Sequence, residues 1–200
     1  MVIGSQKTPL GNQAFSLIQK LLRNTCSECK IIDCSNSSAE LGKLMSNAML
    51  AQRISSINSV SGLCEREQNC SLGQVKEIVS TDQRIGPNYL SAGPGFGGSC
   101  FEKDIKSLVF ILDQAGERVP AQYWQSVLDM NEYQKCRIAS LIAEKVSNKR
   151  RFQACAVQAG ICIMGFSYKK NTGDTRQCQA ARIIDYLSRK EGFKISVTDP

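Results

Sequence analysis

The 200-residue chain contains no histidine. This absence excludes every catalytic pair in which a histidine activates a serine or a cysteine, and it removes a common zinc ligand. A general base must then be a carboxylate, a lysine or a water molecule. The sequence has a single Cys-x-x-Cys pair, Cys26 and Cys29, whereas a cysteine-only zinc site needs two. We therefore expect no bound metal, although by spacing alone this pair could be half of a zinc site or a redox pair.

The chain also lacks a long apolar run and a leader pattern at its first residue. Met1-Val2-Ile3-Gly4 is a short apolar segment that stops at once, and no later run is long enough to span a membrane. We expect a cytoplasmic protein with no membrane partner. In that compartment the ten cysteines are expected to be reduced thiols.

The net charge of +7 comes partly from a basic run at residues 145–151. Such a run is most often a solvated face. We expect no nucleic-acid partner, because aromatic residues do not interleave with the basic ones and no known binding motif is present. A basic site for a small polyanion, such as a nucleotide sugar, fits the charge equally well.

A glycine-rich stretch, residues 93–98, has four glycines in six residues and leads into an apolar periodic segment. Ser99 and Glu102 have the spacing of a capping box, which predicts that a helix starts here. Cys100 then lies in the first turn, where the helix dipole favours a thiolate and makes the thiol nucleophilic. Asp104 follows one turn later on the same face. Two other interpretations stay open, namely a phosphate-binding loop with an uninvolved cysteine and a small buried cysteine.

The first part of the chain reads as a strand at Met1–Ile3, a helix capped by Thr8 and running to about Arg23, and a strand at Lys30–Asp33. The next pattern predicts one helix over residues 37–66, with a capping box formed by Ser37 and Glu40. Four small residues on this helix would allow close packing against another helix: Ala48, Ala51, Ser55 and Ser59. A short helix is predicted from Ser71 to Ser80.

The helix that carries Cys100 is predicted to end near Gly116, and a long helix follows from Pro120 to Val146. Its aromatic residues are typical of a core or a subunit interface. We assign no element to residues 148–159. A strand over 160–166, a helix over 177–190 and a strand over 194–198 form a β-α-β unit. Ligands of such sheets bind beyond the carboxyl ends of the strands, which places the loop 168–176 at a binding edge.

Three segments together resemble one family: residues 40–58, 95–104 and 165–176. The chain is similar to the UDP-glucose 6-dehydrogenases of the UDP-glucose/GDP-mannose dehydrogenase family. The resemblance implies an α/β protein with a central all-helical dimerisation domain at 37–147. It also implies incomplete parallel, Rossmann-like α/β pieces at both ends, namely the tail of an NAD-binding domain at 1–36 and the start of a UDP-binding domain at 160–200. Self-association through the central helices is expected.

The resemblance implies oxidation of UDP-glucose to UDP-glucuronate with two NAD, through a cysteine thiohemiacetal and a thioester. It makes Cys100 the nucleophile, Lys43 the cation that stabilises the oxyanion, Asn47 its hydrogen-bonding neighbour, and Asp104 the carboxylate associated with the hydrolytic water. The implied substrate contacts are Lys43, Asn47, Arg84, Ser91, Ala92, Gly93, Pro94, Gly95, Phe96, Gly97, Tyr168 and Lys169. The implied cofactor contacts are Cys100, Phe101, Glu102, Lys103 and Arg176.

Some features depart from the family pattern. Ser91 stands where a lysine usually precedes the glycine-rich run, and the loss of this charge is expected to weaken phosphate binding. The Gly-x-Gly-x-x-Gly loop that binds NAD is not in this chain, so the chain by itself is expected to be inactive. Two alternatives stay open. One is another nucleotide-sugar dehydrogenase, acting for instance on GDP-mannose, and the other is a truncated, non-catalytic dimerisation partner.

Overall fold

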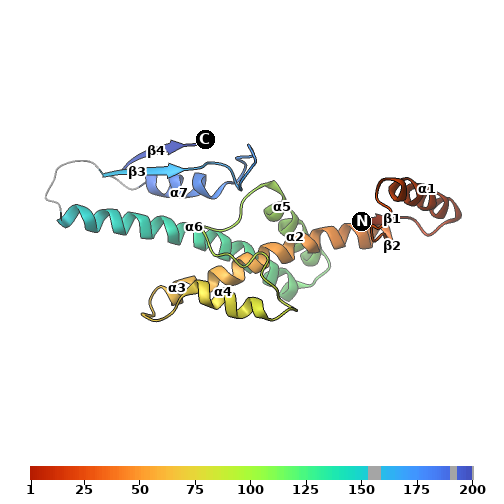
Figure 1. Cartoon of the computed structure of the whole chain (residues 1–200), viewed down its shortest axis with the longest axis horizontal. Helices are drawn as coiled ribbons and strands as arrows, with labels where there is room; N and C mark the ends of the chain where they lie inside the picture. The colour runs from red at the N-terminus through yellow and green to blue at the C-terminus, as the bar shows by residue number, and fades with distance from the viewer. Residues whose placement is uncertain (153–158, 190–192, 200) are drawn as a thin grey trace. The chain divides into compact units, whose positions relative to one another are not determined.

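The computed structural model describes residues 1–152, 159–189 and 193–199. The chain divides into two compact units, Met1–Ser46 and Asn47–Pro200. Helices dominate, and the strands of the described residues pair in two small parallel sheets, β1 with β2 and β3 with β4 (Figure 1). The predicted mixture of helices with small parallel β-α-β pieces is therefore confirmed.

The first unit begins with β1 (Val2–Gly4), α1 (Pro9–Thr25) and β2 (Ile32–Cys34). The predicted cap of α1 is confirmed, because the Thr8 hydroxyl accepts a hydrogen bond from the Gly11 N–H at 3.1 Å. Pro9 occupies the first turn, where its missing N–H is not needed. The two strands lie one or two residues later than predicted and pair in parallel, with Val2 opposite Ile32.

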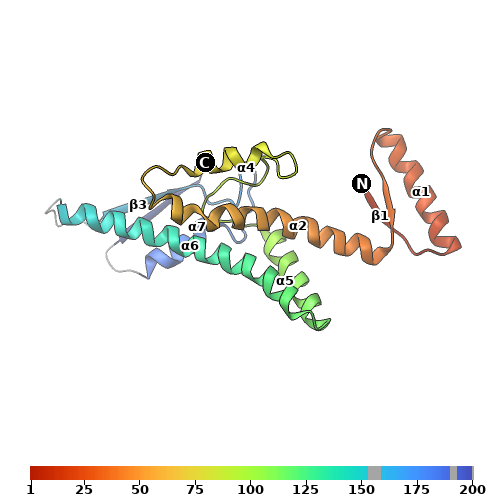
Figure 2. The same cartoon turned by 90° about the horizontal axis from the view of Figure 1, so that it is seen from below.

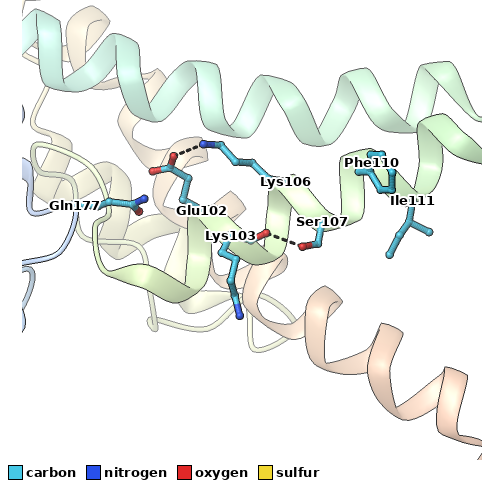
Figure 3. A pocket seen from close by; sticks show the side chains of 7 residues that line it. All are labelled: Glu102, Lys103, Lys106, Ser107, Phe110, Ile111 and Gln177. Carbon is cyan, nitrogen blue, oxygen red and sulfur yellow. Dashed lines mark hydrogen bonds and ion pairs between the residues drawn. The ribbon is translucent and has the colours of Figure 1, made fainter.

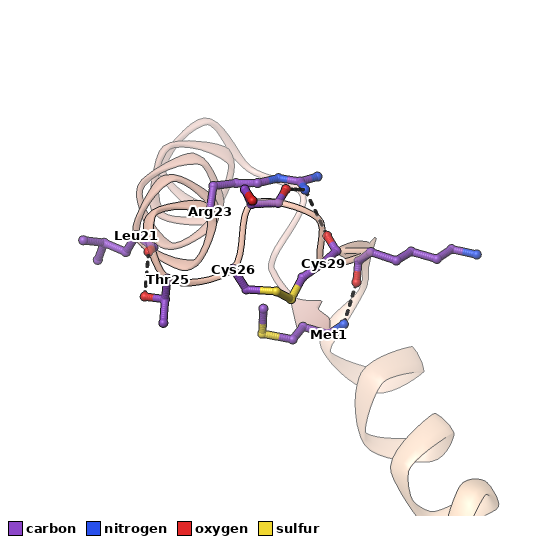
Figure 4. Close-up of a disulfide and its surroundings, with 8 residues drawn as sticks. Met1, Leu21, Arg23, Thr25, Cys26 and Cys29 are labelled. Carbon is purple, nitrogen blue, oxygen red and sulfur yellow. Dashed lines mark hydrogen bonds between the residues drawn. A yellow bond between two sulfur atoms is a disulfide. The ribbon is translucent and has the colours of Figure 1, made fainter.

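A disulfide joins Cys26 and Cys29 just after the end of α1 (Figure 4). Arg23 holds this turn by donating hydrogen bonds to the carbonyl oxygens of Ser27, at 2.7 Å, and Cys29, at 3.0 Å. The expectation that all ten cysteines are reduced is therefore wrong at this pair, since the turn brings the two sulfur atoms together. Within the described residues, no three Cys, Asp or Glu side chains gather as metal ligands would.

The predicted helix 37–66 is in fact two helices, α2 (Asn36–Ser59) and α3 (Ser61–Cys64). The capping box of Ser37 and Glu40 is also wrong. The Ser35 hydroxyl accepts the N–H of Ser38 at 3.2 Å, so the helix is already capped before Ser37 is reached.

The small residues of α2 divide by exposure. Ala48, Ala51 and Ser55 are buried as predicted, and the Ser55 hydroxyl donates to the carbonyl oxygen of Val127 at 2.9 Å. Ser59 is exposed, so the packing prediction is wrong there. A serine side chain of α2, only two atoms long, thus reaches the backbone of the helix that carries Val127. This contact requires the close approach of two helices that small residues permit.

Three helices follow: α4 (Leu72–Thr81), α5 (Ser99–Gln114) and α6 (Arg118–Phe152). At the start of α5, the residue before the helix is Gly98, with φ at +81°, and Glu102 accepts a hydrogen bond from Lys106. The capping box of Ser99 and Glu102 is therefore wrong, although the predicted start of the helix is right. Figure 2 shows α5 running back alongside the first half of α6.

The long helix α6 extends beyond the predicted Pro120–Val146 at both ends. Pro120 lies in its first turn, where proline costs no hydrogen bond. The helix also includes the first residues of the segment 148–159, for which no element was predicted; positions 153–158 of that segment are outside the described residues.

The last elements are β3 (Ala159–Met164), α7 (Gln179–Ser188) and β4 (Phe193–Thr198). The β-α-β prediction is confirmed, since β3 and β4 pair in parallel with Ile161 opposite Ile195. Figure 1 shows α7 between this sheet and the second half of α6. One core cluster joins the three elements: Ala139, Ala143, Ile161, Ile183 and Leu187. It packs β3 and α7, the elements on either side of the loop 165–178, against α6. Among the described helices, none combines the length and the apolar character needed to cross a membrane.

Replacing Ile105 with alanine tests the packing of α5. Ile105 is fully buried, whereas Ile111 on the same helix is 48% exposed. We expect Ile105→Ala to lower the free energy of unfolding by about 2–5 kcal/mol, because it leaves a cavity. The matched control Ile111→Ala should cost less than about 1 kcal/mol. Urea unfolding followed by circular dichroism measures both, and equal losses would contradict the packing described.

Candidate functional site

A cleft of about 600 Å³ brings together three segments that are far apart in the sequence. They are the middle of α2, the glycine-rich loop with the first turn of α5, and the loop between β3 and α7. Its lining residues are Asn47, Leu50, Ile54, Tyr89, Gly95, Phe96, Gly97, Gly98, Ser99, Cys100, Phe101, Tyr168, Lys169, Asp174, Arg176 and Gln179. Of the residues proposed from the sequence, the cleft therefore unites Asn47, Gly95–Gly97, Cys100, Phe101, Tyr168, Lys169 and Arg176.

Asn131 of α6 holds the glycine-rich loop by its backbone. Its side-chain oxygen accepts the Phe96 N–H at 2.7 Å, and its side-chain nitrogen donates to the Phe96 carbonyl at 3.1 Å. This is the hydrogen-bond pattern of a strand partner, supplied by one side chain. Gly95, with φ at +108°, passes so close that an added Cβ would lie 2.3 Å from the Asn131 oxygen. Only glycine fits there, for both reasons.

Three further amide side chains hold the same loop. Asn58 accepts the Gly93 N–H at 3.0 Å, Gln134 donates to the Gly93 carbonyl at 3.0 Å, and Gln179 donates to the Gly95 carbonyl at 2.9 Å. Because buried backbone groups need partners, these amides let a loop without regular structure lie against the core.

Sequence reasoning did not single out these amides as loop contacts. One signal is present in the sequence: Asn131 and Gln134 are buried polar residues on the face of α6 that continues from Val127 and Leu128. Amides at apolar-periodic positions of a helix indicate that the helix contacts a backbone rather than side chains alone.

Cys100 lies in the first turn of α5, exposed to the cleft. The N-terminus of the helix favours negative charge at this position. Arg176 adds a cation: its pKa is raised, mainly by its hydrogen bonds to Asp174 and to a smaller extent by the nearby Cys100 sulfur. The arrangement suits a sulfur nucleophile, because Cys100 is exposed at a helix N-terminus and has a guanidinium nearby.

Asn47 is oriented by a buried carboxylate. Its side-chain nitrogen donates to Asp104 Oδ2 at 2.5 Å, and Asp104 is only 5% exposed. Lys103 Nζ lies 3.4 Å from the other carboxylate oxygen. Asp104 is not among the cleft residues and acts on the cleft through Asn47. Lys43 lies on α2 one turn before Asn47, in the unit Met1–Ser46, and its part in the site stays a prediction.

The loop between β3 and α7 carries the cationic side of the cleft. Arg176 makes two hydrogen bonds to Asp174, at 2.9 and 2.8 Å, and this guanidinium lowers the pKa of Asp174 to about 2. Lys169 Nζ lies 5.4 Å from the centre of the Tyr168 ring. The ring packs on Gly98, where an added Cβ would be 2.8 Å from it. Lys169, the ion pair of Arg176 with Asp174 and a helix N-terminus therefore meet in one cleft, and the net positive charge suits an anionic ligand.

Lys76 of α4 lies beside Ser91, the residue at which the sequence predicts the loss of a positive charge. Its ammonium donates to the Ser91 hydroxyl at 3.0 Å. A cation is thus present beside Ser91, although it comes from another element. No spacing rule relates residues 76 and 91, so the sequence alone does not reveal this pair.

Several predicted site residues do not line the cleft. Arg84 is exposed and pairs with Asp82, with Nη2 and Oδ2 2.6 Å apart. Ser91, Ala92, Gly93 and Pro94 belong to the loop but not to the cleft lining. Glu102 and Lys103 line a separate pocket of about 510 Å³, where Glu102 pairs with Lys106 at 2.6 Å (Figure 3). The helical turn separates these two side chains from Cys100, since successive residues of a helix point in different directions.

The chain is similar to one family of dehydrogenases. The family model "UDP-glucose/GDP-mannose dehydrogenase family, central domain" matches residues 37–133. The chain is 41% identical over 200 residues to a UDP-glucose 6-dehydrogenase of Gallus gallus, and 42% over 204 residues to one of Drosophila melanogaster. Each match covers 100% of the chain but only 39% and 40% of these relatives. The chain thus spans about two fifths of the curated relatives that it matches.

The fold is also found in solved structures. A UDP-glucose dehydrogenase from the archaeon Pyrobaculum islandicum superposes with a TM-score of 0.80 at 30% identity, over 100% of this chain and 42% of that one. A UDP-D-ManNAc dehydrogenase from Pyrococcus horikoshii reaches the same TM-score of 0.80 at 24% identity, over 100% of this chain and 44% of its own, and supports the fold alone.

The reactivity of Cys100 can be compared with that of Cys162, which is also exposed but lies on β3. We expect iodoacetamide to alkylate Cys100 roughly fivefold faster, because a helix N-terminus stabilises negative charge by up to about 1 kcal/mol. Peptide mass spectrometry over a time course at neutral pH measures both rates in one sample. Equal rates would show that the position of Cys100 does not activate its sulfur.

Proposed function

We propose that this chain, whose residues 37–133 match the central-domain model of the UDP-glucose/GDP-mannose dehydrogenase family, serves the NAD-dependent oxidation of UDP-glucose to UDP-glucuronate. The observation that supports this proposal is the cleft in which an exposed cysteine at a helix N-terminus faces an amide and two cationic side chains. A cysteine of this kind is the nucleophile needed to carry an aldehyde to the level of an acid.

Cys100 acts on the aldehyde that the first oxidation produces. Its thiolate sulfur bonds to the aldehyde carbon, and the carbonyl oxygen becomes the alkoxide of a thiohemiacetal. Loss of a hydride from the same carbon leaves a thioester on Cys100. Water then adds to the thioester carbonyl, and the sulfur leaves as the thiolate while the sugar departs as a carboxylate. NAD, when bound, accepts the hydride of each oxidation.

Asn47 and Lys43 stabilise the oxygen of the reacting carbon. An amide N–H and an ammonium are groups that stabilise an oxyanion as it develops, and they need no histidine. Asp104 is a positioning residue: buried and bonded to Asn47 at 2.5 Å, it holds that amide in one orientation. As the resemblance implies, Asp104 is also proposed to be the carboxylate associated with the water that hydrolyses the thioester.

The diphosphate of the sugar nucleotide is proposed to meet the cationic side chains at and beside the glycine-rich loop. Lys169 lies in the cleft, and Lys76 reaches the loop at Ser91. Arg176 and the N-terminus of α5 offer a further anion site, which fits the pyrophosphate of NAD. Arg84, exposed and outside the cleft, is proposed to reach the substrate of a neighbouring subunit.

Binding of UDP-glucose tests this assignment without requiring turnover. We expect isothermal titration calorimetry with the 200-residue chain to show binding that UDP competes for, and GDP-mannose to bind at least about tenfold more weakly, because the loop backbone would select the base. Tighter binding of GDP-mannose would favour a different nucleotide-sugar dehydrogenase, and no binding of either would contradict the proposal.

Lys76→Met tests, in the same assay, whether the Lys76 ammonium beside Ser91 contributes to the binding of UDP-glucose. We expect a loss of roughly fivefold in affinity for UDP-glucose, since an exposed charge-assisted contact is worth about 1 kcal/mol. The control Lys20→Met removes an exposed lysine of α1 and should leave the affinity unchanged. Equal affinities of the two variants for UDP-glucose would show that Lys76 does not replace the positive charge that is missing at Ser91.

We also propose that the central helices, within a domain at residues 37–147, pair two copies of the chain. Flanking α/β domains would include residues 1–36 and 160–200. On α6, Tyr123 and Tyr133 are 51% and 57% exposed, whereas Trp124 between them is buried. Exposed aromatic residues are enriched at interfaces between subunits.

Sedimentation velocity tests the pairing. We expect a species of about twice the monomer mass that Tyr133→Asp shifts toward monomer, because a charge at the core of an interface is strongly unfavourable. The control Phe110→Asp changes an exposed aromatic residue of α5. A sedimentation coefficient of the monomer for the unaltered chain would contradict the proposal.

A further inference from the structure

Two thiols away from the cleft lie in contact. Cys64 is the last residue of α3 and is 8% exposed, and Cys70 precedes α4 and is partly exposed. Their sulfur atoms are 2.9 Å apart, with Cys70 donating to Cys64. A disulfide bond is about 2.05 Å long, so the two atoms need to approach by only about 0.9 Å to be joined.

We propose that Cys64 and Cys70 form an oxidisable dithiol, a covalent modification site that takes a two-electron oxidant of the peroxide class. The Cys70 sulfur attacks one peroxide oxygen, the O–O bond breaks, and the products are a sulfenic acid and water when the oxidant is hydrogen peroxide. The Cys64 sulfur then bonds to the Cys70 sulfur, and a second water leaves. Two thiols and one peroxide thus give one disulfide and two waters.

The surroundings of the two sulfur atoms determine which of them reacts with the oxidant first. The contact with Cys70 and burial both raise the pKa of the Cys64 thiol. Cys64 is buried and therefore shielded, while Cys70, the more exposed of the two, meets the oxidant first. Cys64 is already in place to resolve the sulfenic acid, which protects Cys70 from further oxidation.

The position of this pair connects it to the loop that lines the cleft. Ser61, in the same short helix as Cys64, accepts a hydrogen bond from Gln134, and Gln134 also holds the Gly93 carbonyl. Glu65, next to Cys64, pairs with Arg137 of the same α6. A disulfide between Cys64 and Cys70 would tie the end of α3 to the start of α4 beside these contacts. The inference concerns a modification of the chain and is independent of the proposed oxidation of UDP-glucose.

Trypsin distinguishes this link from all others, because Arg66 lies between the two cysteines. Cleavage after Arg53, Arg66 and Lys76 gives the peptides 54–66 and 67–76, each with one of the two cysteines. Cys26 and Cys29 stay together in the peptide 24–30 and do not interfere. We expect hydrogen peroxide to produce a disulfide-linked pair of 54–66 with 67–76 that is absent after dithiothreitol.

The decisive quantity is the rate at which the disulfide between Cys64 and Cys70 forms. In the folded chain we expect it to form at least about tenfold faster than any link that involves Cys100 or Cys162, because the sulfur atoms already touch. Cys70→Ser and Cys64→Ala should each abolish it, whereas Cys136→Ser should leave it unchanged. The proposal is overturned if the link forms no faster in the folded chain than in 6 M urea, or if peroxide leaves both cysteines as thiols while Cys100 is oxidised.

Discussion

The site depends on one constraint: a glycine-rich loop must lie against helices without the hydrogen bonds of regular structure. Amide side chains meet this requirement. Asn131 pairs with both backbone groups of Phe96, while Asn58 and Gln134 pair with the two backbone groups of Gly93. Each is buried, so a loss would leave backbone groups unsatisfied at a cost of about 1–3 kcal/mol apiece. The loop is therefore a fixed wall of the cleft.

The fixed glycine-rich loop determines where the side chains of the cleft lie. The loop delivers the chain to the start of α5, so Cys100 lies at the positive end of a helix. The opposite side is the loop after β3, which is held against the glycine-rich loop where Tyr168 packs on Gly98 and where the Gly98 N–H donates to the Arg176 carbonyl. Arg176 is in turn oriented by Asp174. The two loops that line the cleft are thus held to each other, and Arg176 is held by Asp174, so these parts of the cleft are positioned by the chain itself.

Local signals in the sequence served well where a single contact decides the structure, and poorly where two candidates compete. Thr8 was the one good cap before α1, and it forms the predicted bond. The capping box of Ser37 failed because Ser35 is an equally good cap two residues earlier. The capping box of Ser99 failed because Gly98, and not Ser99, is the residue before the helix, and because Glu102 pairs with Lys106. The break after α2 was also missed, since the apolar periodicity continues across Val60.

The sequence by itself determined the order of the helices and strands except for the short helix α3, the place of Cys100 in a first helical turn, and the resemblance to a dehydrogenase family. These depend on periodicity, on turn residues and on motifs, all of which are local. Only the tertiary structure decided which side chains share the cleft. Asp104 is placed beneath Asn47, Glu102 is turned to another pocket, and Lys76 is brought to Ser91. These outcomes arise from contacts between elements far apart in the chain, whose geometry no local pattern encodes.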